Sequence, residues 1–207
     1  MSRSVPAPFH FSAGCLCLDF ANTRSWRPSA APHERLLGHD DLLRWGQRAG
    51  LLTGRQAATF RAAAARRPAA ARAAQREALA LRETIYRAFS AIADGAHFDG
   101  KDAAHLFTRL AGILRGRQIR AQAGRLATAP TQRGGAEGLE GLVLWPVVWS
   151  ATTLLAAPEL AVVRKCAASN CGWLFIDTTR NRSRRWCDMR VCGNRAKVRA
   201  YQHRTSS

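Results

Sequence analysis

Four cysteines near the end of the chain have the spacing of metal ligands. Cys166 and Cys171 form one pair, and Cys187 and Cys192 form a second pair after 15 intervening residues. Two short pairs joined by a mid-length loop place four thiolates around one tetrahedral ion. Thiolates are soft ligands that favour zinc over magnesium or calcium. The spacing therefore predicts one zinc ion, with an iron–sulfur cluster and four unliganded cysteines as the alternatives.

The predicted zinc site has the composition of a structural centre. A catalytic zinc usually keeps three protein ligands and one open position for water, whereas four cysteines fill every position of a tetrahedron. Between residues 164 and 207 the only histidine is His203, and no His-Glu-x-x-His motif lies nearby. We therefore expect zinc to stabilise a segment too small for a core of its own, and we expect the protein not to be an enzyme.

Basic residues are concentrated in the same segment. Residues 164–207 carry 11 Lys and Arg against 2 acidic residues, whereas the far longer segment 1–163 carries 21 against 12. The net charge of the chain is +18, and 29 of its 32 basic residues are arginine. A GC-rich genome produces such an arginine bias along a whole gene, but it does not produce a gradient. The gradient predicts an acidic partner, with nucleic acid as the first candidate.

The elements around the cysteines are expected to be a hairpin and a helix. Residues 172–177 form an apolar strand, and residues 178–185 form the Arg-rich tip of the hairpin. After the last cysteine, Asn194 is a suitable N-cap for a helix. In that helix Val198 and Tyr201 are expected to lie nearer the core.

The basic side chains of the tip and the helix suit phosphate and groove contacts. The residues predicted to contact nucleic acid are Arg180, Arg182, Arg184, Arg185, Arg195, Lys197, Arg199 and Arg204. Each one alone also fits an ordinary solvated charge. We expect Trp173 and Trp186 to pack over the small core beside the cysteines, with stacking on bases as the alternative.

The region before residue 160 is predicted to be mainly helical, because apolar residues recur at helical spacing. The predicted helices span residues 40–49, 53–67, 69–93, 102–114 and 139–157. Alternation over Cys15–Phe20 predicts a strand, and residues 118–129 are assigned to strands as well. The fold class that follows is α+β, with a mainly helical α/β N-terminal domain that holds a small sheet.

One uncharged stretch, Leu142–Pro158, requires a decision between core and membrane. It has 17 residues and contains Pro146, whereas a membrane span needs about 20 apolar residues. We expect a buried core helix, with a dimer interface as the alternative. Residues 1–10 show no apolar signal segment, and we expect a cytoplasmic protein without a membrane partner.

Polar residues after the predicted first strand are candidates for a ligand pocket. Asp19, Asn22 and Thr23 bring a carboxylate, an amide and a hydroxyl to one end of that strand. The alternative is that Asn22 or Thr23 caps a turn and that Asp19 pairs with an arginine. Cys15 and Cys17 lie nearby; they are either a redox pair or second metal site, or simply buried thiols.

The motifs of the chain resemble a known family. The run Cys166-x4-Cys171-Gly-Trp-Leu-Phe-Ile-Asp, followed by Arg-Arg-Trp-Cys187-Asp-Met-x-x-Cys192-Gly-Asn-Arg-x-Lys197, resembles the CGNR zinc finger. The segment Leu-Asp-Phe-Ala-Asn-Thr23 resembles the start of the ABATE domain, which precedes that finger in many bacterial proteins described as stress-induced transcription regulators. The resemblance implies an α/β regulatory domain, a finger that binds DNA, and zinc ligation by the four cysteines.

These observations combine into one expectation. Residues 1–160 form an ABATE-like domain that senses a small ligand or partner, and residues 161–207 form a treble-clef-like or ribbon-like finger with a β-hairpin and a helix. The protein is expected to be a zinc-dependent, DNA-binding transcription regulator. A homodimer is one option for its assembly, because regulators often dimerise to read paired half-sites. The alternative is an RNA-binding or ribosome-associated zinc protein.

Overall fold

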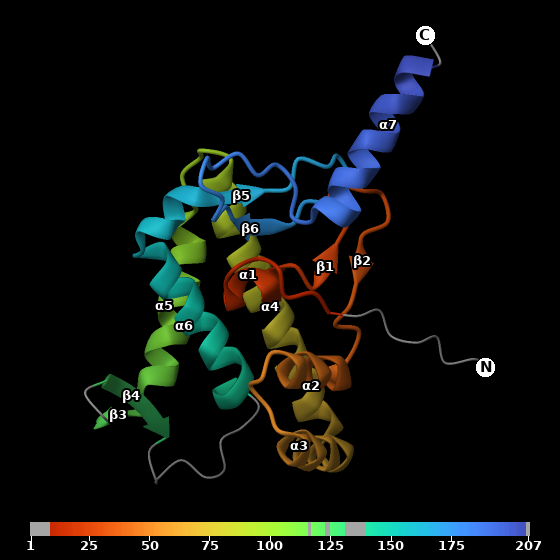
Figure 1. Ribbon diagram of the computed structural model, residues 1–207. Coiled ribbons are helices and arrows are strands. Elements are labelled where there is room, and N and C mark those ends of the chain that lie inside the picture. Colours follow the sequence, from red (N-terminus) through yellow and green to blue (C-terminus); the bar gives the residue numbers. More distant parts are fainter. Residues whose placement is uncertain (1–8, 116, 123–124, 131–139, 206–207) are drawn as a thin grey trace, which may run out of the picture.

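Helices make up most of the chain and short antiparallel hairpins join them (Figure 1). The computed structural model describes residues 9–115, 117–122, 125–130 and 140–205. The α-helices are α1 (Leu16–Ala21), α2 (His39–Arg48), α3 (Gly54–Arg66), α4 (Pro68–Ala93), α5 (Gly100–Arg115), α6 (Trp145–Leu155) and α7 (Asn194–Thr205). The strand pairs are β1 (Arg24–Ser25) with β2 (His33–Glu34), β3 (Arg117–Gln122) with β4 (Arg125–Pro130), and β5 (Val163–Lys165) with β6 (Leu174–Ile176).

The 26-residue helix α4 is the axis of the fold, and α1, α2, α3 and α5 all contact it. It starts with Pro68, whose fixed φ suits the first turn of a helix. It ends at Ala93, with Asp94 as the C-cap and Gly95 at φ +72° after it. Leu81, Ile85 and Phe89 recur along one side and are completely buried. This stripe confirms the helix that the sequence predicted over residues 69–93.

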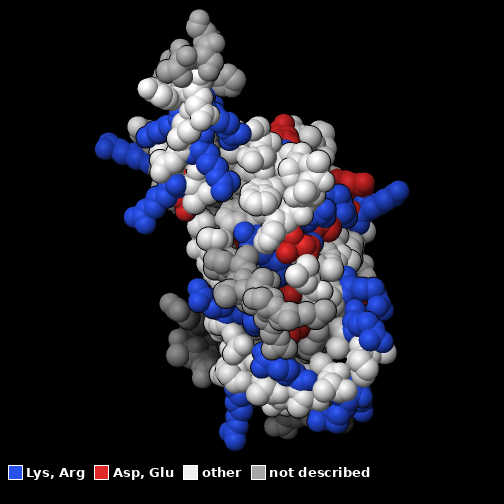
Figure 2. All heavy atoms as spheres, turned by 90° about the vertical axis from the view of Figure 1, so that its right-hand side faces the viewer, with Lys and Arg blue, Asp and Glu red and all other residues white. Residues whose placement is uncertain are grey.

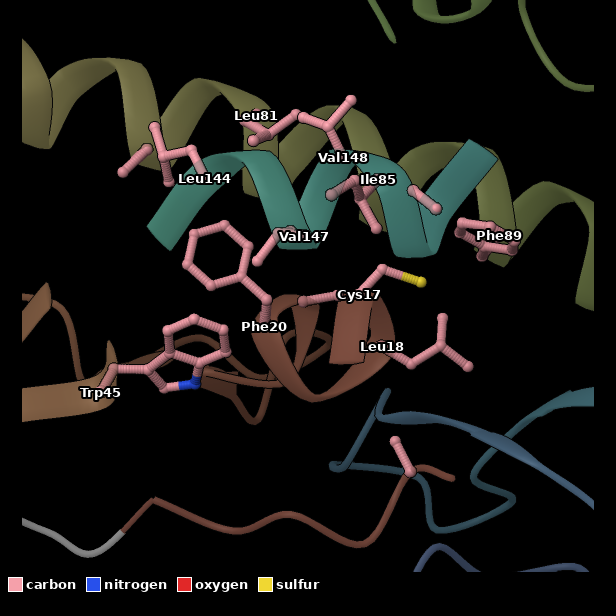
Figure 3. Close-up of a cluster of buried hydrophobic side chains, with 14 of the residues drawn as sticks. Cys17, Leu18, Phe20, Trp45, Leu81, Ile85, Phe89, Leu144, Val147 and Val148 are labelled. Carbon is pink, nitrogen blue, oxygen red and sulfur yellow. The ribbon is translucent and has the colours of Figure 1, made fainter. Parts of the chain in front are cut away.

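Helix α1 occupies the centre of the main core, and it corrects the strand predicted over Cys15–Phe20. Cys17 points toward α4 and α6, Leu18 points away from them, and Phe20 lies against Trp45 of α2 (Figure 3). An element that is buried on every side has no polar face, so its apolar residues fit a strand period as well as a helical one. The alternation of apolar residues over Cys15–Phe20 therefore did not distinguish a strand from a buried helix.

Helix α6 is buried along one side, as the sequence predicted for the uncharged stretch. Val147, Val148 and Ala151 are completely buried against α1 and α5, whereas Trp149 is 48% exposed. A π-helical turn (Glu140–Leu144) and a 3₁₀ turn (Pro158–Val162) flank the helix. Within the described residues, no helix is long and apolar enough to cross a membrane.

The hairpin β5–β6 has two buried faces and joins two hydrophobic cores. Its register pairs Val163 with Ile176 and Lys165 with Leu174. Val163, Leu174 and Ile176 belong to the main core, whereas Phe175, which points the opposite way, packs with the four cysteines. The finger contains a β-hairpin, as expected, but the prediction placed its turn wrongly. The strand β6 pairs with the preceding strand β5, so the turn of the hairpin holds Cys166 and Cys171 and not the Arg-rich segment 178–185. The sequence prediction missed the three-residue strand β5, whose partner only the tertiary pairing reveals.

Candidate metal centre and nucleic-acid interface

The four predicted ligand cysteines come together in one buried cluster. Their sulfur atoms all lie within 4.8 Å of one another, and each residue is at most 6% exposed. The Sγ–Sγ distances are 3.6 Å for Cys171–Cys187 and 3.7 Å for Cys187–Cys192. Four sulfurs about 2.3 Å from a zinc ion stand about 3.8 Å apart in a tetrahedron. The donor set and its spacing therefore suit one zinc ion.

The electrostatics of the cluster also call for a cation. Hydrogen bonds with the sulfurs of Cys166 and Cys171, together with burial, hold the pKa of Cys187 far above its usual value. Four adjacent buried thiols cannot all ionise unless a positive charge compensates them. A bound zinc ion supplies that charge, because a thiol that coordinates a metal is deprotonated outright.

Backbone hydrogen bonds hold the first cysteine pair in place. The Cys166 N–H donates to Trp173 O at 2.8 Å, and the Cys171 N–H donates to Ala168 O at 3.0 Å. Gly172 then turns the chain with φ +72°, and a Cβ there would lie 3.1–3.2 Å from Pro28, Arg27 and Tyr86. Glycine is needed at this point both for its φ and for the close approach to the helical region.

The second cysteine pair lies where a helical segment begins, and the sequence prediction placed the N-cap of that segment six residues too late, at Asn194 instead of Asp188. Asp188 is the N-cap, and its carboxylate accepts from the Arg190 and Val191 N–H groups at 2.7 and 3.3 Å. A π-helical turn (Met189–Gly193) follows and runs directly into α7. Asn194, the predicted cap, already has helical angles and is the first residue of α7.

Helix α7 projects from the body of the molecule (Figure 1), and Figure 2 shows basic side chains gathered around it. Val198 and Tyr201 are 55% and 62% exposed, so the prediction that they face the core is wrong. Arg195 and Lys197 are exposed, and Arg199 is half-buried, with a hydrogen bond to Ser169 Oγ at 3.1 Å. The side chain of Arg204 lies outside the described residues.

The Arg-rich segment 178–185 is a loop that Asp177 organises. One oxygen of this buried carboxylate accepts from the Thr179 N–H and hydroxyl at 2.9 and 2.6 Å, and the other accepts from the Arg184 N–H at 2.9 Å. Burial alone would raise the pKa of Asp177, but these hydrogen bonds and the nearby Arg164 charge hold it below its usual value. The ionised carboxylate therefore fixes the loop shape at neutral pH.

The four loop arginines do not share one environment. Arg180, Arg182 and Arg185 are exposed. Arg184 instead turns inward: it donates to the carbonyl oxygens of Trp186 and Cys187, and its guanidinium lies 4.5 Å from the Phe175 ring centre. Arg184 thus braces the cysteine cluster, whereas its neighbours face solvent.

Trp173 and Trp186 pack against the cysteine cluster. The Trp173 indole N–H donates to Ser25 Oγ at 3.1 Å, and the guanidinium of Arg185 lies 5.4 Å from the Trp186 ring centre. These contacts agree with the expectation that both rings cover the small core.

Each of the three residues proposed for a ligand pocket makes contacts within the protein. The Asn22 amide donates to Leu174 O at 2.8 Å and accepts from the Leu174 N–H at 2.9 Å, so it pairs with β6 as another strand would. Thr23 donates to Phe20 O at 2.7 Å, back toward α1, and so it does not cap the turn that follows. Asp19 accepts from the Ala13 N–H at 3.0 Å, and burial raises its pKa to about 6. A ligand role for these three stays a prediction.

The two remaining cysteines lie side by side. Cys15 Sγ and Cys17 Sγ are 3.2 Å apart, and both are free thiols. The hydrogen bond from Cys17 lowers the pKa of Cys15 to about 6, and burial raises that of Cys17. Ser150 on α6 also lies 3.6 Å from the Cys15 sulfur. The two sulfurs therefore share a hydrogen bond, and a redox role for the pair stays a prediction.

A pocket of about 180 Å³ separates the β1–β2 hairpin from the cysteine cluster. His10, Trp26, Arg35 and Trp173 line it, together with Arg195 of α7. Nothing in the sequence singles out Trp26, because a lone tryptophan between Ser25 and Arg27 in a proline-containing loop carries no motif. Its position depends on the packing of two segments more than 100 residues apart in sequence.

Comparison with known families finds a match for each of two successive segments of the chain. Residues 14–158 match the family ABATE, described as a putative stress-induced transcription regulator. Residues 163–205 match the CGNR zinc finger. Comparison with curated proteins found no match.

Proposed function

The chain belongs to the ABATE family of transcription regulators and carries a CGNR zinc finger, and we propose that it regulates transcription by zinc-dependent binding to DNA. In this proposal the segment 161–207 makes the nucleic-acid contacts, and the segment 1–160 positions it and responds to an effector. The proposal concerns binding and assigns no catalytic step to any residue.

The observation that carries the proposal is the distribution of charge around the cluster. The exposed basic residues of the described finger lie in the loop after Asp177, in the π-helical turn that holds Arg190, and in helix α7, and all three adjoin the second cysteine pair. The finger segment 164–207 has only two acidic residues, and both are used internally: Asp177 shapes the loop, and Asp188 caps the helix. The basic side chains are therefore left to face a polyanion.

Zinc is central to this proposal because it joins the two basic elements. Cys187 and Cys192 precede α7, and Cys166 and Cys171 form the tip of β5–β6. A zinc ion bound by all four would fix the helix relative to the loop, as in other structural zinc sites. Without the ion, the loop after Asp177 and helix α7 would no longer be held in a fixed arrangement, and their basic side chains would no longer form one surface.

The test is a selection of bound duplexes from a random pool with zinc-loaded full-length protein, at about 0.15 M salt, where exposed charges are largely screened. We expect enrichment of a specific site whose binding is lost with a chelator. The double variant Arg182→Gln/Arg195→Gln should keep its zinc and bind that site more weakly. Binding without enrichment, or an equal affinity after chelation, would contradict the proposal. A preference for RNA at equal salt would instead support the RNA-binding alternative.

A further inference from the structure

Trp26 has an unusual backbone conformation for its size. Its φ is +54°, and among the described residues only Arg182 shares a positive φ without being glycine. A bulky side chain in the left-handed region is strained, and such strain is kept where the surroundings or a function require it. Glycine or asparagine would fit this turn better. The presence of tryptophan at this strained position therefore suggests that its ring has a function.

The turn around Trp26 is fixed by its neighbours and not by its ring. The Trp26 carbonyl accepts from the Ser29 N–H at 2.9 Å and from the Ser29 hydroxyl at 2.8 Å. The preceding Ser25 points inward and accepts from the Trp173 indole. Trp26 then points outward, where its ring is 41% exposed and stands 5.7 Å from the His33 ring. The hairpin is thus anchored to the finger through one residue and presents the next one to solvent.

The exposed ring borders a groove along the finger helix. This groove has a volume of about 740 Å³, and Trp26 and Asn170 line it together with Arg190, Val191, Arg195 and Val198. Val191 and Val198 are 43% and 55% exposed, so the groove has an apolar floor. Arg199 also lines it, and none of its described lining residues is acidic. Arginines beside an apolar surface suit a ligand whose phosphates lie on its outer side and whose flat, apolar groups lie on its inner side.

We propose that the groove between Trp26 and α7 receives duplex DNA, with Trp26 as an apolar wedge supplied by the N-terminal region. Arg190, Arg195 and Arg199 would contact phosphates, and the Trp26 ring would contact sugars and bases beside the helix, as apolar side chains do in other DNA grooves. This inference rests on the proposed function and adds to it. The ABATE region takes part in DNA binding directly, and it does not only sense an effector.

The experiment compares Trp26→Gly with the wild type by fluorescence anisotropy on a labelled duplex that carries the selected site. Trp26→Gly should weaken binding about tenfold, in the range of a lost aromatic–base contact, and should leave the slope of log K against log salt unchanged. Arg195→Gln should lower that slope by about 0.9, because it removes one phosphate contact. Because glycine suits φ +54° but lacks the ring's contact with His33, the gain and the loss offset each other, and the melting temperature of Trp26→Gly should stay close to that of the wild type.

A matched control removes an exposed tryptophan elsewhere. Trp149 is 48% exposed and belongs to α6, a helix that lies away from α7 (Figure 1), so Trp149→Ala should bind DNA as the wild type does. Trp26→Gly within twofold of the wild type would overturn the inference and leave the proposed function intact. A lower melting temperature or zinc content together with weaker binding would overturn it as well, because Trp26 would then be structural. A loss seen with single-stranded RNA but not with the duplex would overturn the assignment to DNA. If the wild type binds no duplex, the proposed function itself fails.

Discussion

The two hydrophobic cores of this protein differ in what holds them together. The main core is built from large apolar side chains, among which Phe20, Trp45 and Phe89 are completely buried. The second core surrounds four cysteines, and Phe175 is its one large, completely buried side chain among the described residues. Burial of apolar area stabilises the first core. The second core has too little of that area, so we expect its stability to depend on the metal.

The two cores are nevertheless parts of one body. The strand β6 sends Leu174 and Ile176 into the main core and Phe175 into the cysteine core. The Ile176 N–H also donates to Ala13 O at 2.8 Å, and the Asn22 amide pairs with the Leu174 backbone. Without metal, β6 should therefore keep its place, because the main core holds it, whereas the loop and α7 should lose theirs.

The largest expected effect comes from removing one zinc ligand. Cys187→Ser should lower the bound zinc from one ion per chain to none and abolish specific DNA binding, because structural zinc contributes about 10–16 kcal/mol to the folding of small zinc units. Zinc analysis and anisotropy measure both effects. Cys17→Ser is the matched control: this buried cysteine belongs to the main core, and its variant should keep one zinc. Retention of zinc by Cys187→Ser would remove the basis for the metal-dependent core.

The next largest effect should come from the main core. Phe20→Ala deletes a completely buried ring that contacts Trp45, and such deletions cost about 3–5 kcal/mol. Urea unfolding followed by the helical circular dichroism signal measures this loss. The zinc content should stay at one ion per chain. A loss below about 1 kcal/mol would show that this core is more loosely packed than the structure indicates.

A smaller effect is expected at the junction of the two cores. Asn22→Ala leaves the buried N–H and C=O of Leu174 without their partners, at a cost of about 2–3 kcal/mol. Faster amide exchange in β6 should accompany the loss. Asn181→Ala, in the exposed loop, serves as the control and should change stability by less than about 0.5 kcal/mol. Equal effects of the two variants would show that Asn22 does not join the cores.

The smallest effect is a pH dependence within the main core. Burial raises the pKa of Asp19 to about 6, whereas the unfolded chain has about 3.9. Between these values the folded protein holds a proton that the unfolded chain has lost, so this contribution to stability is full below pH 4 and disappears toward pH 6. Asp19→Asn cannot ionise, and it should gain about 1–2 kcal/mol over the wild type from pH 4 to pH 7. Urea unfolding at several pH values checks this, and parallel curves for the two proteins would contradict it.

The sequence was sufficient for those features that depend on spacing within a segment. The cysteine pairs, the stripe along α4 and the uncharged helix α6 all follow from local periodicity, and the structure confirms each of them. Such features depend little on what the rest of the chain does.

The features that the sequence did not predict depend on tertiary contacts. Residues 17–21 of helix α1 are all buried, so the helix shows no amphipathic period. The partner of β6 is a three-residue strand, which is too short to be recognised alone. Arg184 turns inward because Phe175 and two carbonyl groups lie beside it, and sequence cannot distinguish it from its exposed neighbours. The groove at Trp26 arises only when β1–β2 meets α7.

Hydrogen exchange before and after zinc removal tests the central claim most directly. The claim is that metal organises the cysteine core and the DNA-facing elements, whereas apolar packing maintains the main core. After chelation, we expect amide protection to disappear in residues 178–205 and to persist in α1, α4, α6 and β6. Loss of protection throughout the chain, or unchanged protection in α7 and the loop, would contradict the account.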